Sequence, residues 1–281
     1  MSLGIAFKGS EGVVLAADSR VTLTAQLPTT VAGQVVLLPA TFDNATKLLK
    51  VKGQDHVGAV TYGVGALGQT QPRTPHSFLT EFETELEKSH PDRLSVEAFA
   101  EKLGTFFMGK WKEARMPPSV PDPEQMVFLI GGFDEGAVYG RLFDVYVPNR
   151  PTPKEQLVGD FGALFGGQRE FVDRLLRGYD ARLPEMTKSA LSLSAADEAK
   201  LATKLNELAT AIPYQFLPLQ DCVDLSVFLI RTTINLQTWQ IGVRGVGGAI
   251  DIATITQTAG FKPLQEKVIR VTSQSGSTKY E

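Results

Sequence analysis

The 281-residue sequence contains one cysteine, three histidines and no apolar run long enough to cross a bilayer. Because Cys222 stands alone, an internal disulfide and a zinc site with several cysteines are excluded, and a small buried apolar residue is the favoured interpretation. So little cysteine is typical of a reducing cytoplasm. The longest apolar runs, such as MVFLI at 126–130, fall far short of the roughly 20 residues that a spanning helix needs. We therefore expect no membrane partner.

The sequence also lacks a large excess of either charge: its net charge is −3, and its lysines and arginines form no basic stripe. This balance gives no electrostatic basis for binding nucleic acid or an anionic membrane. The first twenty residues include Lys8, Glu11, Asp18 and Arg20, which interrupt any apolar core of the kind that a secretory signal needs. We expect a cytoplasmic protein.

The histidines are too scattered for metal or triad chemistry. His56, His76 and His90 fall in expected loops or at a helix start, and no two have i, i+4 spacing. We therefore expect no metal, and histidines that are satisfied or at the surface. No G-x-S-x-G elbow is present, so nucleophilic chemistry would need a base other than histidine. No cofactor is expected.

One motif, GVGALG at 63–68, matches G-x-G-x-x-G after an apolar strand. Dinucleotide binding requires a helix to begin within that motif. Here QTQPRTP follows, and Pro72 and Pro75 oppose a helix. A tight glycine turn is the better interpretation.

The order of expected elements is strands, two helices, strands, helices, strands. LGIAFK (3–8) and VVLAA (13–17) flank GSEG, which is a hairpin pattern. Further expected elements lie at 34–42, 47–51, 56–62, 76–88, 95–111, 126–133, 138–147, 160–180, 194–211, 221–239, 247–256 and 267–273. Strand blocks alternating with helix pairs favour α+β layers over a parallel βαβ sheet. We expect one domain spanning 1–281.

Some finer expectations concern helix ends and burial. Ser194 with Asp197 resembles a capping box, and Asp221 is a candidate cap for the next helix. That helix is apolar on several sides, which predicts burial. VPNRPTP at 147–153 is a Pro-rich segment, and the tail after 273 is expected to fray.

The opening hairpin brings a hydroxyl beside charged groups. With GSEG as the turn, residue 3 lies opposite residue 18, which places Ser2 near Asp18 and Arg20. If Met1 is removed, the α-amine of Ser2, with an ordinary pKa of about 7.7–8.0, could act as the base that serine needs. Taken alone, the residues favour the simpler alternative, an ordinary strand start with a surface Asp–Arg pair.

GIAFKGSEGVVLAADSR resembles the opening of proteasome β-type subunits, which are N-terminal-nucleophile hydrolases. Counting back from Asp18 places Ser2 at the nucleophile position, and ATKLLKV places Lys47 in the slot of the family's lysine. TYGVGALG offers Gly63, or Gly65 with a shifted register, for the oxyanion glycine. FGGQREFVDRLL and VGGAIDIATIT resemble the family's later helix start and closing strand. The likeness is dense in 2–20, 45–66 and 245–256, and indicates a divergent member of bacterial or archaeal type.

The sequence also departs from the family. Serine replaces the usual threonine, and insertions are expected near 21–45 and 185–216. Supporting polar positions of the family fall on Val243, Val246 and near Gln125, so that polar network is not evident.

The resemblance implies a four-layer α-β-β-α sandwich of two antiparallel sheets and an amidohydrolase that cuts peptide or other amide bonds. Ser2 would be the nucleophile. Lys47 would lower the effective pKa of the Ser2 hydroxyl, and Asp18 would hold Lys47 and the α-amine in place. Gly63 would donate to the oxyanion, and Arg20 would pin the Asp18 turn.

The alternative is a catalytically silent structural subunit, for which proteasome α-type subunits are the family's example. Transfer of the acyl group to an amine instead of water is a third hypothesis. A peptide or protein substrate and a homo-oligomer are the expected partners, while sequence leaves any ATPase partner unknown.

Overall fold

The computed structural model describes residues 2–28, 35–68, 71–89, 92–122 and 124–267. Its strands are β1 (Leu3–Lys8), β2 (Val13–Asp18), β3 (Val21–Pro28), β4 (Val35–Phe42), β5 (Leu48–Leu49), β6 (Val57–Gly63), β7 (Met126–Gly132), β8 (Arg141–Val147), β9 (Arg150–Gln156), β10 (Gly162–Gly167), β11 (Ile250–Thr256) and β12 (Gly260–Gln265). Its α-helices are α1 (Leu79–Ser89), α2 (Val96–Glu113), α3 (Glu170–Leu176), α4 (Leu183–Leu191), α5 (Ala195–Asn206) and α6 (Leu219–Trp239). Short 3₁₀ turns lie at Pro75–Phe78 and Tyr214–Phe216.

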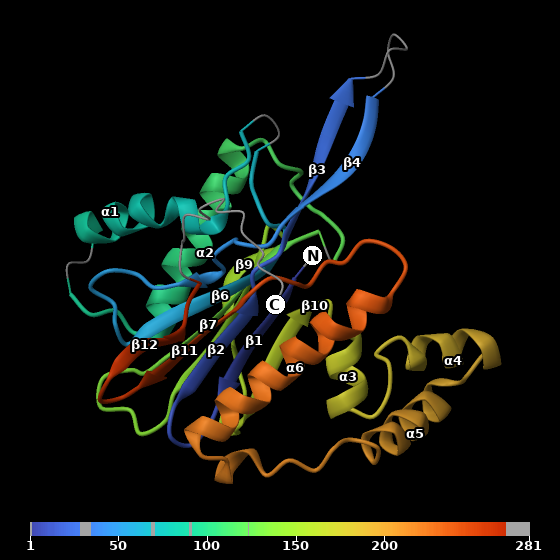
Figure 1. Ribbon diagram of the computed structural model, residues 1–281. Helices are drawn as coiled ribbons and strands as arrows, with labels where there is room; N and C mark the ends of the chain where they lie inside the picture. Colours follow the sequence, from blue (N-terminus) through green and yellow to red (C-terminus); the bar gives the residue numbers. More distant parts are fainter. Residues whose placement is uncertain (1, 29–34, 69–70, 90–91, 123, 268–281) are drawn as a thin grey trace, which may run out of the picture.

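Two five-stranded antiparallel sheets stack between two helical layers (Figure 1). One sheet has the order β10-β1-β2-β11-β12 and is covered by α3 and α6; the other has the order β5-β6-β7-β8-β9 and is covered by α1 and α2. This arrangement confirms the predicted four-layer α-β-β-α sandwich.

The apolar runs of the central strands follow from burial on both faces. Along β7, Met126, Phe128 and Ile130 pack toward the helices, while Val127 and Leu129 pack against the opposite sheet. Successive side chains of the strand point to opposite faces, and here both faces are apolar: one packs on the helices and the other on the second sheet. A strand placed this way shows a continuous apolar run in the sequence.

The opening hairpin has the predicted register. Lys8 pairs with Val13 and Gly4 with Ala17, and the turn closes with a 2.9 Å hydrogen bond from Gly9 N to Gly12 O. Gly4 lies directly against the Tyr62 ring, where a Cβ atom would come within 2.9 Å of Cδ1. The hairpin thereby packs closely against β6, the strand that carries Gly63.

Several local expectations need correction. The Pro-rich segment forms β9, because an edge strand tolerates proline, which lacks the N–H of a ladder. Helix α6 begins at Leu219 after Pro218, so Asp221 lies in its first turn and does not cap it. Only one face of α6 is buried, and Trp239 is 77% exposed.

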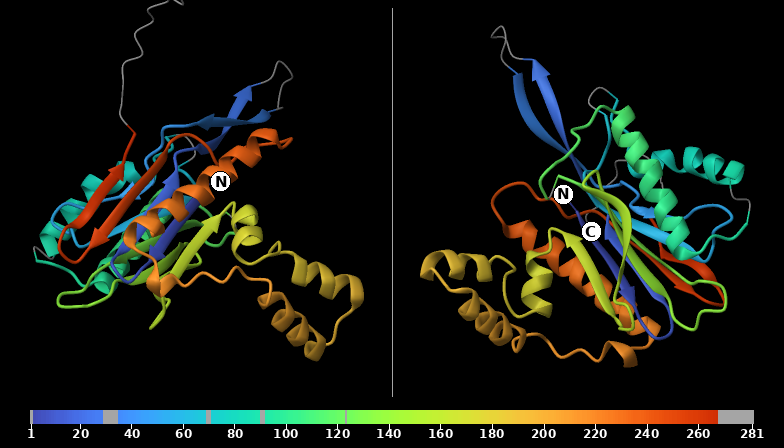
Figure 2. Two further views of the ribbon diagram at one scale, coloured as in Figure 1. Left: turned by 60° about the horizontal axis from the view of Figure 1, so that its bottom comes forward. Right: turned by 180° about the vertical axis from the view of Figure 1, so that it is seen from behind.

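Two further parts of the fold lie outside the four layers and can be followed in the ribbon of Figures 1 and 2. Strands β3 and β4 form a separate two-stranded ribbon that extends away from the sandwich, and α4 and α5 stand beside α3 (Figures 1 and 2). Ser194 caps α5 as predicted, accepting a hydrogen bond from Asp197 N. The expected strand at 267–273 lies almost entirely outside the described residues, and β12 occupies the sheet edge instead. Within the described ranges, no helix is long and apolar enough to cross a membrane.

Candidate active site

Backbone hydrogen bonds fix Ser2 on both sides. Its carbonyl oxygen accepts a 2.8 Å bond from Gln168 N, and the following amide, Leu3 N, donates to Asp18 Oδ1 at 3.0 Å. Gly167 makes this approach possible, because a Cβ there would lie 1.9 Å from the Ser2 carbonyl oxygen. Its φ of +91° also favours glycine. Ser2 is therefore held in place at the start of β1, with only 3% of its surface exposed.

Asp18, at the end of β2, is fully buried and joins three chain segments. Its Oδ1 accepts from Leu3 N and from Lys47 Nζ, the latter at 2.7 Å. Its Oδ2 accepts from Arg20 N and Gly247 N, each at 3.0 Å. A carboxylate has about four acceptor positions, and all of them are used here. The surface Asp–Arg pair considered from the sequence is thus wrong for Asp18.

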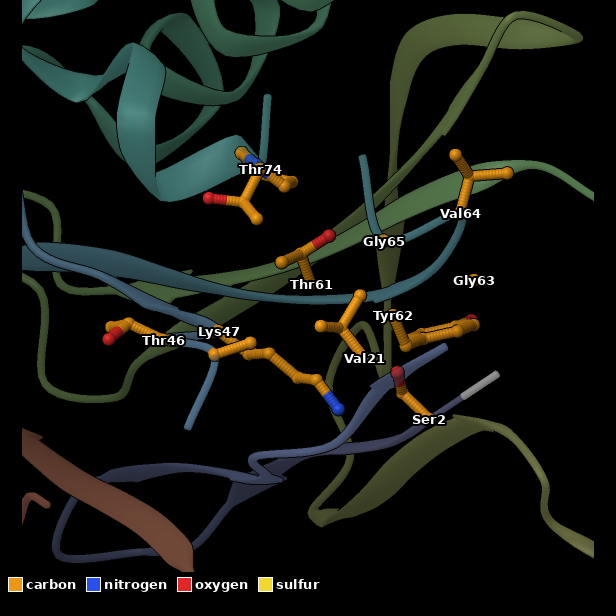
Figure 3. Close-up of a pocket in the computed structure, with 12 residues that line it drawn as sticks. Ser2, Val21, Thr46, Lys47, Thr61, Tyr62, Gly63, Val64, Gly65 and Thr74 are labelled. Atoms are coloured by element: carbon orange, nitrogen blue, oxygen red, sulfur yellow. The ribbon is translucent and has the colours of Figure 1, made fainter. Parts of the chain in front are cut away.

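Lys47 lies immediately before β5, where its carbonyl oxygen accepts from Thr61 N at 3.0 Å. Its side chain reaches Asp18, and Figure 3 shows the ammonium directed into the space beside the Ser2 hydroxyl. Burial lowers the pKa of Lys47 from its ordinary value, although the Asp18 carboxylate acts in the opposite direction.

Gly63 ends β6 at the edge of the same pocket. Thr61 N points toward Lys47, and Val64 N donates to Gln125 O on the other side. Because amide directions alternate along a strand, the Gly63 N–H also points toward the Lys47 side, beyond the end of β5. Its φ is +88°, and a Cβ would lie 1.9 Å from Gln125 O, so the position requires glycine. Both glycines considered from the sequence, Gly63 and Gly65, line the pocket, and Gly63 lies at a position that only glycine can occupy.

Three of the predicted residues line one small cavity of about 20 Å³, and Asp18 lies outside its wall (Figure 3). Its walls include Ser2, Lys47 and Gly63, with Val21 and Thr61. The volume is room for about one water molecule. The Thr61 Oγ1 atom is buried and has no hydrogen-bond partner within the described part of the chain. A buried hydroxyl without a partner is costly, and a bound polar group would satisfy it.

Arg20 supports the site from outside the cavity. Its guanidinium pairs with Asp43, donates to Arg244 O at 3.3 Å, and lies over Gly247. Only its backbone N–H contacts Asp18. The structure therefore brings the other four predicted residues together and places the Arg20 guanidinium outside the cavity.

Sequence reasoning missed several contributors. Gln168 and Gly247 lie in Gly-rich motifs that were noted, but their N–H contacts depend on the fold. Gln237 on α6 and Thr61 on β6 gave no motif signal. The spacing of Gln237, seven residues after buried Ile230, places it on the same helix face and could have marked a buried polar residue.

His56, His76 and Cys222 do not line the pocket. His56 Nε2 lies 2.7 Å from Leu94 O and must donate to it, so that ring is a satisfied buried histidine as predicted. Cys222 is fully buried, also as predicted. His90 lies outside the described residues. Among the residues that the structure covers, no three His, Cys, Asp or Glu side chains are grouped to hold a metal.

Comparison with known proteins adds evidence at the level of fold. No protein-family model matches the sequence, and no curated protein does either. Solved structures do match, among them Anbu (a Gly-1 mutant) from Hyphomicrobium sp. strain MC1. Its TM-score is 0.53 at 15% identity, covering 98% of this chain and 89% of that one. The chain is therefore similar to Anbu in architecture and has the fold of N-terminal-nucleophile hydrolases.

Proposed function

We propose that the protein is an N-terminal-nucleophile amidohydrolase, a proteasome-like peptidase whose nucleophile is Ser2. The contact between Lys47 Nζ and Asp18 Oδ1 carries the proposal, because the same carboxylate oxygen also holds the amide that follows Ser2. A buried charge pair carries a desolvation cost, and buried charged groups beside a cavity cluster at functional sites.

The chemistry begins once Met1 has been removed. The freed α-amine of Ser2 takes the Oγ proton, directly or through one water, while Oγ bonds to the substrate carbonyl carbon. The Gly63 N–H donates to the oxyanion, and Lys47 stabilises the developing charge. The amine then passes its proton to the leaving nitrogen as the C–N bond breaks. Water hydrolyses the remaining ester and restores Ser2.

The pocket supports a small polar side chain on the acyl side of the scissile bond. Its volume of about 20 Å³ and the unpartnered hydroxyl of Thr61 suit a hydroxymethyl or methyl group. In a panel of peptide amides, serine or alanine should be preferred over leucine at this position. Serine should also react faster than alanine, because it can bond to the Thr61 hydroxyl. In the Thr61→Val variant, the ratio of the serine rate to the alanine rate should fall roughly tenfold, the effect of one lost hydrogen bond. An unchanged ratio would contradict this assignment.

The function is tested by the rate of covalent modification with a peptide epoxyketone, which needs both an N-terminal amine and its adjacent hydroxyl. Ser2→Thr keeps both groups and should react. Ser2→Ala should not react, and Lys47→Met should react at least about 100-fold more slowly. Lys8→Met is the matched control, since Lys8 is also buried but its Nζ donates to Leu157 O, away from the pocket.

A catalytically silent subunit is the second candidate, favoured by the small size of the pocket. It predicts no modification of the parent protein or of Ser2→Thr, with all variants still folded. Equal reaction of Ser2→Ala and the parent would show that the probe modifies another residue and would contradict the proposal.

A further inference from the structure

We propose that Gln237 is a positioning residue that couples the turn holding Ser2 to the loop holding Asp18. The inference rests on the proposed function, since it concerns the geometry of the same nucleophile. Gln237 lies in the last turn of α6, is 2% exposed, and does not line the cavity.

The Gln237 amide makes one hydrogen bond from each end. Its Oε1 accepts from Val246 N at 2.9 Å, and its Nε2 donates to Gln168 Oε1. A backbone N–H can only donate, so the amide oxygen must face Val246 and the amide nitrogen must face Gln168. The orientation of Gln237 is thus fixed by its surroundings.

The Gln237 side chain thus forms a bridge between Gln168 and Val246, and each end of this bridge continues to a residue of the active site. On one side, Gln168 N donates to the Ser2 carbonyl oxygen. On the other, Gly247 N, next to Val246, donates to Asp18 Oδ2, while the Gly247 carbonyl oxygen accepts from Ser19 N at 3.0 Å. One side-chain amide therefore joins the segment that bonds to the Ser2 carbonyl oxygen to the segment that bonds to the Asp18 carboxylate.

An apolar residue at position 237 would leave the buried Val246 N–H without its acceptor, which is a local cost. The residues from Gln240 to Ala249 link α6 to β11 and include several glycines, so the bridge restricts a segment of low intrinsic rigidity. A displacement of about 1 Å at a reacting group can cost roughly 100-fold in rate. The bridge acts on the rate of attack and leaves substrate binding to the cavity walls.

The test compares variants of the protein after Met1 removal, with inactivation by the epoxyketone separated into a binding constant and a maximal rate. Gln237→Met preserves length but removes both hydrogen bonds. It should lower the maximal rate roughly 10- to 100-fold with a binding constant changed less than about twofold. Thr233→Val is the control: Thr233 is buried on the same helix, but its hydroxyl bonds only to Leu229 O.

Gln237→Glu adds a readout that a purely structural role would not move. A neutral carboxyl in that variant can accept from Val246 N and donate to Gln168, as the amide does, whereas the ionised form cannot donate. Burial raises a carboxyl pKa, while the Arg20 guanidinium, which lies over Gly247 next to Val246, acts in the opposite direction. The ratio of variant to parent rate, measured from about pH 5 to 8, should therefore fall as pH rises. The ratio cancels titrations that both proteins share.

A flat ratio over this range, or a Gln237→Met variant as fast as Thr233→Val, would overturn the inference and leave the proposed function intact. If Gln237→Met does not fold, the pH series on Gln237→Glu still tests whether Gln237 is a positioning residue. A parent protein that fails to react contradicts the proposed function itself, and this inference falls with it before any variant is compared.

Discussion

At the Asp18 carboxylate, four hydrogen bonds from four different residues converge on two oxygen atoms. The site and the stability of the fold therefore depend on the same residue. Nearby Asp43 also binds a cation, Arg20, but this pair is partly exposed to solvent. The two aspartates allow a direct comparison of a buried charge pair with a solvated one.

Asp18→Asn should destabilise the protein by about 3–5 kcal/mol, because it leaves the Lys47 ammonium without its counter-charge and turns an amide nitrogen toward existing donors. Asp43→Asn should cost about 0–1 kcal/mol, as is usual for exposed pairs. Urea unfolding of both variants measures the difference. Equal losses would show that the Asp18 pair is not the buried support described here.

His56 predicts a pH dependence of stability. Burial lowers the pKa of its ring in the folded protein, so the unfolded chain binds the extra proton first as pH falls. The free energy of unfolding should thus decrease as pH falls below about 6.5, by at most about 1.4 kcal/mol per pH unit from this group. The His56→Gln variant should lack this component. The same slope in both proteins would exclude His56 as its source.

Among the elements, those with strong local patterns were predicted and those defined by partners were not. The helical spacing at 95–111 predicted a helix, and α2 buries Val96, Phe99 and Leu103 on one face. Strand β9 was missed, because its two prolines oppose a strand unless it lies at an edge. Whether a strand lies at an edge depends on the order of all strands in the sheet, and the residues of that strand alone cannot predict it.

The β3–β4 ribbon is an element whose strands pair only with each other, as far as the described residues show. Thr22 and Thr41 are Cα partners within it. Replacing residues 23–40 with an Asn-Gly turn should therefore close the shortened hairpin. We expect the unfolding midpoint to change by less than about 2 °C, the equivalent of roughly 1 kcal/mol for a chain of this length.

Thermal unfolding monitored by circular dichroism measures this change. A loss of cooperativity, or a much larger decrease, would show that the ribbon supports the sandwich. The reaction with the epoxyketone should continue in the shortened protein, because Val21, the ribbon residue that lines the cavity, is retained.

Across the whole molecule, the four layers and the grouping of Ser2, Asp18, Lys47 and Gly63 were expected from the resemblance to proteasome β-type subunits, and the structure has the four layers and brings these residues together. Those residues lie in or next to short strands whose register follows from a hairpin and a few glycines. Gln237 could not be assigned in the same way, because its contacts join segments some 70 residues apart in the chain. Thr61 is likewise distinguished only by a cavity that exists after folding.

The central claim is that Ser2, once exposed as the first residue, attacks through its own hydroxyl and amine. The most direct test is the mass of the tryptic peptide that ends at Lys8, measured after treatment with a peptide epoxyketone. We predict the peptide SLGIAFK, without Met1, carrying one adduct that blocks both the α-amine and the hydroxyl of Ser2. A peptide that retains Met1, or an unmodified SLGIAFK with the adduct elsewhere in the chain, would contradict the account.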